Sequence, residues 1–106
     1  MAQRGQIWWA DLGFSEHKRV MVISNNQRNN ALKSVIGLYV TSNTNKPFIP
    51  SIARFEAGEL GEAASLVLAD DPWVVPDEDL KGLITGATPA QMMRVNEAIK
   101  AALHLQ

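Results

Sequence analysis

Apolar residues gather in short segments separated by turn-forming residues, a pattern typical of a mainly β protein. Gln6–Leu12 is rich in aromatic and β-favouring residues and ends at Gly13. Val20–Ile23 is a continuous apolar run, and Ser34–Thr41 carries β-branched residues along its length. We predict strands over these three segments and a short helical turn over Gln27–Leu32.

The middle of the chain predicts further short elements joined by turns. Lys46–Pro50 contains two prolines and is expected to form a loop, because proline donates no hydrogen bond to a sheet. Ser51–Glu56 and Ala64–Ala69 are expected to be strands. A bend at Asp70–Pro72 is expected to precede another strand at Trp73–Val75, followed by one helical turn over Pro76–Leu80.

The C-terminal segment predicts an amphipathic helix that extends to His104. Thr88 followed by Pro89 is a favourable pair for a helix start. Met92, Val95, Ile99 and Leu103 then recur at helical spacing. The whole pattern therefore favours a small, strongly bent sheet or barrel with a helix laid across it, a mainly β (α+β) fold.

Composition is that of an ordinary globular protein. With 106 residues, 46% hydrophobic and 20% charged, the chain fits a single domain over residues 1–106. It contains no cysteine, which excludes disulfides, thiolate zinc sites and thiol nucleophiles and suits a reducing cytoplasm. Neither a signal peptide nor a membrane span is expected from its hydropathy.

Charge divides the chain into two halves of opposite sign. Residues 1–54 carry seven cations and two acids, a net charge of +5, whereas residues 55–106 carry three cations and nine acids, a net charge of −6. Such asymmetry can focus positive potential on one face for a polyanion. Chance clustering accounts for it equally well.

The sequence lacks the common catalytic motifs: no phosphate-binding glycine loop, no HExxH, no nucleophile elbow and no metal cluster. We therefore expect no metal and no cofactor. The loop that contains Glu16, His17, Lys18 and Arg19 combines a carboxylate, an imidazole and two cations, the groups that metal-free phosphodiester cleavage requires. Residues 41–43 could add neutral donors. A solvated turn and an ordinary strand end are the competing interpretation.

Several segments resemble the MazF/PemK toxins of toxin–antitoxin pairs. Arg4–Leu12 is similar to the family's opening RGDIYWADL, and Ser15-Glu16 is similar to its GSEQ loop. Val20–Asn25 resembles RPVLVISN, and Val40–Ser42 resembles the PxTS segment. Val95–Ile99 resembles part of the family's final helix, so the similarity spans nearly the whole chain.

The resemblance implies an SH3-like small β-barrel with C-terminal helices. It also implies a homodimer whose interface forms an RNA groove, and metal-independent, sequence-specific cleavage of single-stranded RNA in the cytoplasm. The implied partner is a cognate antitoxin whose acidic, disordered C-terminal segment fills that groove.

Catalytic positions follow from the resemblance residue by residue. Thr41 falls on the family's catalytic threonine and Glu16 on the glutamate of the GSEQ loop. Lys18 stands where the family has its catalytic arginine, and Arg19 stands at the proline that follows. Lysine and arginine are not interchangeable at phosphate sites, so either Lys18 or Arg19 could fill the role.

Five further residues are candidate RNA-binding positions: His17, Ser42, Asn43, Asp71 and Trp73. The segment around Asp71 and Trp73 departs from the family's QIRT, since tryptophan replaces the arginine. Trp73 could stack on a base, although packing in the core is the favoured interpretation. Trp8 and Trp9 are expected to point to opposite faces of one strand.

Two alternatives to RNA cleavage remain open at this stage. One is a non-enzymatic toxin of the related gyrase-poisoning type, which would depend on the extreme C-terminus, Ala102–Gln106. The other is a degenerate family member that binds RNA or antitoxin without cutting.

Overall fold

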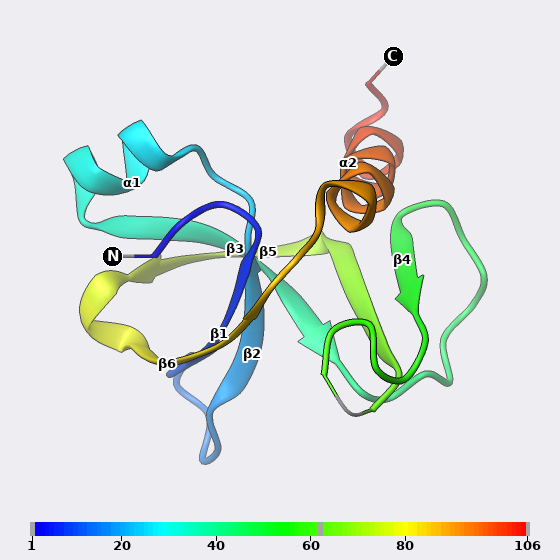
Figure 1. Ribbon diagram of the computed structural model, residues 1–106, viewed down its shortest axis with the longest axis horizontal. Helices are drawn as coiled ribbons and strands as arrows, with labels where there is room; N and C mark the ends of the chain where they lie inside the picture. Colours follow the sequence, from blue (N-terminus) through cyan, green and yellow to red (C-terminus); the bar gives the residue numbers. More distant parts are fainter. Residues whose placement is uncertain (1, 62, 106) are drawn as a thin grey trace.

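A computed structural model describes residues 2–61 and 63–105; of the predicted domain, only Met1, Glu62 and Gln106 lie outside the described residues. Over these ranges the chain forms one sheet, two helices and a 3-10 turn (Figure 1). In chain order these are β1 (Gln6–Ala10), β2 (Lys18–Val22), α1 (Asn26–Leu32), β3 (Ser34–Thr41), β4 (Ile52–Phe55), β5 (Ser65–Pro76), the 3-10 turn η1 (Asp77–Asp79), β6 (Leu80–Gly86) and α2 (Pro89–Leu103).

The sheet has the strand order β4-β5-β3-β2-β1-β6, and every neighbouring pair is antiparallel. Strands β4 and β6 form its two edges in the described residues, so the sheet is bent but not closed. The mainly β fold with a C-terminal helix is confirmed. The barrel that the resemblance implied is not closed, because β4 and β6 do not pair with each other.

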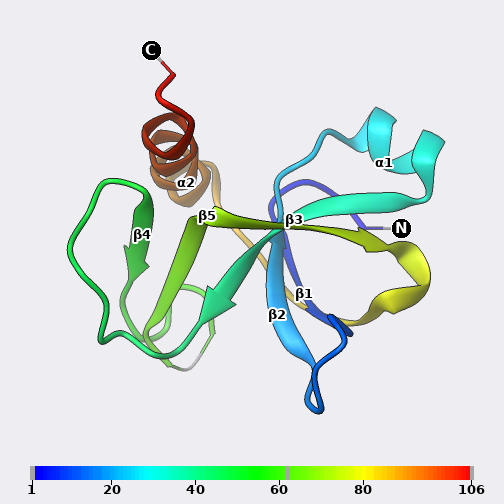
Figure 2. The same cartoon turned by 180° about the vertical axis from the view of Figure 1, so that it is seen from behind.

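Residues on the two faces of the sheet form two separate cores. Ile7, Met21 and Val67 belong to the core on the face that α2 covers with Val95. In Figures 1 and 2, α2 lies beside the half of the sheet that contains β4. The second core, on the opposite face, consists of Ala2, Ala10, Val20, Val22, Val35 and Val75, with Trp8, Leu12, Trp73 and Leu80 packed against it.

The predicted helix start is confirmed in detail. The Thr88 hydroxyl accepts a hydrogen bond from the Gln91 backbone N–H (3.2 Å), and the Gln91 side chain accepts one from the Thr88 backbone N–H (2.9 Å). This reciprocal capping box satisfies two donors that a helix start otherwise leaves unpaired. The helix extends to Leu103, and His104 ends it in a left-handed conformation.

The segment after Ala64 differs from the prediction. The two strands predicted at 64–69 and 73–75 are one continuous strand, β5, and the bend predicted between them is a shift in its pairing with β3. Tyr39 pairs with Leu68 and Leu38 with Pro72, so residues 69–71 form a bulge that absorbs the bend without ending the strand.

Most of the other predicted elements are present, and one strand was missed. Strands β1 to β4, the short helix α1 and the turn η1 are confirmed within a few residues, while β6 was not predicted at all. The opposite orientation of the two tryptophans is also confirmed, because Trp8 packs on the second core and Trp9 is exposed.

Candidate functional site

Strands β2 and β3 bring the two main candidate segments together. Their antiparallel register pairs Arg19 with Val40 and Val20 with Tyr39. Directly opposite residues share a face of a sheet, and successive residues alternate between faces. Lys18 and Thr41 therefore lie on the same face as Val20 and Tyr39, the face of the second core, whereas Arg19 lies on the face that carries α2.

A cleft of about 190 Å³ lies where these strands end. It is lined by one residue of β1, by the loop before β2 and its first residues, and by the end of β3: Trp9, Glu16, His17, Lys18, Arg19, Tyr39, Val40, Thr41 and Ser42. The structure thus brings together all four predicted catalytic residues and two of the predicted RNA-binding residues, His17 and Ser42.

Asn43 lies just beyond the cleft and orients Thr41. The Asn43 backbone N–H donates a hydrogen bond to Thr41 Oγ1 (3.0 Å), and Asn43 Oδ1 accepts one from the Asn45 backbone N–H (3.1 Å). Because Thr41 Oγ1 acts as an acceptor toward its own loop, its proton remains available to a group in the cleft.

Arg19 is fixed on the side of the sheet away from Lys18. Its Nη1 donates a hydrogen bond to Ser65 Oγ on β5 (3.1 Å), and Ser65 is buried. Burial lowers the pKa of the Arg19 guanidinium, and Tyr39 acts in the opposite direction. The guanidinium is consequently a partly desolvated, anchored cation.

Lys18 lies next to an aromatic pair of which the sequence motifs identify Trp73 but not Phe14. Its Nζ is 5.8 Å from the ring centroid of Phe14, and Phe14 packs edge-on against Trp73 with centroids 6.0 Å apart. Phe14 is an aromatic residue in an otherwise polar loop, which is the signal that could have identified it. Trp73 Nε1 donates a hydrogen bond to Asp71 Oδ1 (2.9 Å).

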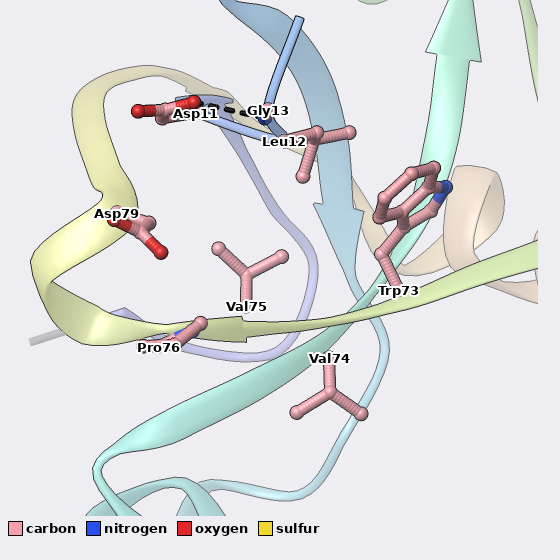
Figure 3. Close-up of a pocket in the computed structure, with 8 residues that line it drawn as sticks. All are labelled: Asp11, Leu12, Gly13, Trp73, Val74, Val75, Pro76 and Asp79. Carbon is pink, nitrogen blue, oxygen red and sulfur yellow. Dashed lines mark hydrogen bonds between the residues drawn. The ribbon is translucent and has the colours of Figure 1, made fainter.

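Trp73 and Asp71 therefore lie outside the cleft. Trp73 lines a neighbouring hollow of about 400 Å³ between β5, the loop that follows β1, and η1 (Figure 3). Leu12, Gly13 and Val75 also border this hollow. Trp73 packs against the second core, as favoured from the sequence, and Phe14 lies between it and Lys18.

Among residues 2–61 and 63–105, no group of three or more His, Cys, Asp or Glu side chains is placed to hold a metal ion. The same part of the chain contains no helix of the length and apolarity needed to cross a membrane. His104, exposed at the end of α2, is not among the residues that line the cleft.

Comparison with known families gives a match over residues 3–103 to the family described as "PemK-like, MazF-like toxin of type II toxin-antitoxin system". The "Endoribonuclease MazF4" of Mycobacterium tuberculosis is 30% identical over 102 residues, which cover 96% of this chain and 92% of that protein. The "Endoribonuclease MazF1" of Mycobacterium bovis has the same identity and coverage.

Solved structures agree with the sequence comparison. An "Endoribonuclease in complex with its cognate antitoxin from Mycobacterial species" superposes with a TM-score of 0.87 and 28% identity, covering 100% of this chain and 98% of that one. The Mycobacterium tuberculosis toxin MazF-mt6 superposes with a TM-score of 0.79 at 21% identity, covering 95% of this chain and 98% of that one, a likeness of fold.

Proposed function

This chain belongs to the PemK-like, MazF-like toxins of type II toxin–antitoxin systems, and on that premise we propose that it is a cytoplasmic endoribonuclease that cuts single-stranded RNA and is neutralised by a cognate antitoxin. The observation that carries the proposal is the meeting of Lys18 and Thr41 on one face of the sheet, at a cleft that Glu16 and His17 also line. Its relatives of 30% identity bear the name endoribonuclease.

The residues of the cleft suit cleavage by the RNA's own 2′-hydroxyl. In that reaction the 2′-oxygen loses its proton and bonds to phosphorus while the P–O5′ bond breaks, which leaves a 2′,3′-cyclic phosphate and a 5′-hydroxyl. Lys18 would stabilise the charge on the phosphorane, and the Thr41 hydroxyl would donate to one of its oxygens. Glu16 and His17 are the candidate proton carriers, one accepting the 2′ proton and one protonating the leaving oxygen.

Between the two cations, Lys18 is the better candidate for contact with the scissile phosphate. Lys18 shares a face with Thr41, whereas Arg19 points to the α2 face and is held there by Ser65. We assign Arg19 a positioning role, in which it holds β2 against β5.

Assembly is proposed on the same family basis. A homodimer would place two copies of the cleft along one RNA groove. The basic character of residues 1–54, with a net charge of +5, suits an acidic, disordered antitoxin segment that competes for the groove. Sedimentation of the toxin alone tests the homodimer, and RNA binding measured as antitoxin is added tests the competition.

The deciding experiment is incubation of the purified protein with a long single-stranded RNA in EDTA, followed by mapping of the ends. We expect discrete cuts with 5′-hydroxyl ends. Thr41→Val and Lys18→Ala should each lower the rate by about 10²- to 10³-fold, the usual effect of removing one group that stabilises developing charge. Lys18→Arg should retain cutting, because it introduces the arginine that the family resemblance places at this position.

Lys100→Ala is the matched control, since Lys100 lies on α2 away from the cleft and its ion pair among the described residues is with Glu97 (3.6 Å). If Lys100→Ala lost as much RNA cleavage as Lys18→Ala, the loss would come from the change in net charge and not from the cleft. Loss in Arg19→Ala with normal folding, but not in Lys18→Ala, would reverse the assignment of the two cations. RNA binding without cutting would identify a degenerate member of the family.

A further inference from the structure

The loop between β3 and β4 presents the aromatic side chain of Phe48 to solvent. Phe48 is 86% exposed, and the Arg54 guanidinium of β4 lies over its ring, 3.6 Å from the centroid. We propose that Phe48, backed by Arg54, is a stacking platform for the base of a nucleotide next to the scissile phosphate. This inference rests on the proposed function and names a substrate contact that the family's motifs do not include.

The platform is held in place by Arg54. Its guanidinium donates hydrogen bonds to three backbone carbonyls of the loop, those of Thr44 (3.3 Å), Lys46 and Pro47 (3.1 Å). Its Nε is buried and has no hydrogen-bond partner among the described residues, so the loop closes over this edge of the side chain. Arg54 therefore fixes the loop and covers one face of the Phe48 ring, while the ring's 86% exposure leaves the other face open.

The register places the platform beside the cleft. Thr41 pairs with Leu66 across β3 and β5, and Leu66 pairs with Arg54 across β5 and β4. These three residues therefore share one face of the sheet, and two strand spacings separate Arg54 from Thr41, about 10 Å. Leu66 also lines the hollow that contains Phe48 and Arg54. A strand of RNA held at Thr41 could reach the platform with an adjacent nucleotide.

Single-stranded RNA is the partner that this arrangement fits best. Each unpaired base has a flat π-face that stacks on an aromatic ring, and cations beside the ring attract the phosphate backbone. Lys46 belongs to the same loop, and Lys18 lies farther along the same face. A stacking contact of this kind tolerates any base, so it would position the chain and leave sequence readout to other groups.

The test measures binding to an RNA whose 2′-hydroxyl at the cut is replaced by hydrogen, which separates binding from cleavage. We expect Phe48→Ala to weaken binding by about 5- to 150-fold, the range for loss of one stacked base. With cleavable RNA the same variant should raise KM and leave kcat nearly unchanged. Phe48→Trp should keep RNA binding near the wild-type level, because it keeps an aromatic ring. Leu32→Ala, which removes an exposed side chain on α1, is the matched control.

An abasic scan locates the contact. RNAs that lack one base at a time near the cut are compared on the wild type and on Phe48→Ala. One abasic position should weaken wild-type binding about as much as the substitution does, and should have no further effect in Phe48→Ala.

Two outcomes would overturn the platform: unchanged RNA binding by Phe48→Ala, or equal sensitivity of both proteins at every abasic position. Weaker binding of the antitoxin to Phe48→Ala, with RNA binding unchanged, would also overturn it and would make Phe48 a protein contact. If the wild type binds RNA through Phe48 but never cuts, the proposed cleavage fails, and Phe48 is left as an RNA-binding contact with no scissile phosphate beside it. The two failures are therefore distinguishable.

Discussion

Gly37 in β3 provides a direct test of how tightly β2 and β3 must pack. A Cβ added at Gly37 would lie 2.9 Å from Val20 Cβ and 3.1 Å from its Cγ2, closer than carbon atoms normally approach. Val20 is fully buried in the second core and cannot swing away. Forcing an extra methyl group into a packed core costs about 1–3 kcal/mol, so we expect Gly37→Ala to destabilise the protein by about 2 kcal/mol.

Thermal and urea unfolding measure this effect. For a domain of this size, about 2 kcal/mol corresponds to a fall in Tm of roughly 10 °C. Gly86→Ala in β6 is the control, because its added Cβ meets nothing within 4 Å. Because alanine restricts the unfolded chain more than glycine does, Gly86→Ala should leave the free energy of unfolding unchanged or raise it by about 0.4–1 kcal/mol.

The clash also predicts coupling between the two positions. Val20→Ala removes Cγ2 but keeps Cβ, so in that background only the 3.1 Å contact is relieved and Gly37→Ala should cost somewhat less than in the wild type. Strictly additive losses, or a Gly37→Ala protein as stable as the wild type, would refute the packing argument. The pairing of these strands also aligns Lys18 with Thr41, so the single variant should lose RNA cleavage beyond its loss of folded protein.

Two further predictions concern stability away from the cleft. Thr88→Ala removes the hydroxyl that accepts from the Gln91 N–H and should cost about 1 kcal/mol in urea unfolding, whereas Thr88→Ser should cost little. The pKa of Glu59 is lowered from its ordinary 4.5, first by the Glu56 backbone N–H and then by Arg94. This stabilisation is present above pH 4.5 and is lost as the pH falls through the lowered pKa. The wild type should therefore have a larger free energy of unfolding than Glu59→Gln above pH 4.5, and the difference should shrink in the acidic range. A difference that does not change with pH would contradict this.

Much of the fold follows from local sequence signals. The start of α2 is specified by Thr88 and Pro89 and by apolar spacing, all of which act within a few residues. Strand β6 lacks such a signal, because Gly82 and Gly86 interrupt it and none of its residues is fully buried. Its conformation depends on pairing with β1, a contact that only the folded chain provides.

The residues of the cleft also could be predicted only in part from local sequence signals. Sequence motifs identify Lys18, Arg19 and Thr41 as candidates but leave the two cations equivalent. The choice between them depends on strand register, since alternate residues face opposite sides of the sheet. Phe48 could not be selected from the sequence, because an aromatic residue in a loop becomes informative only when its exposure and its neighbours are known.

The strand order has a consequence for when activity can arise during synthesis. Strands β2 and β3 are close in sequence, but β1 has β6 as its second neighbour, so the sheet is complete only after residue 86 has emerged from the ribosome. Contacts between distant segments form late in folding because a long loop must close first. A partly made chain therefore lacks a finished sheet until β6 has been synthesised and can pair with β1, the strand that contributes Trp9 to the cleft.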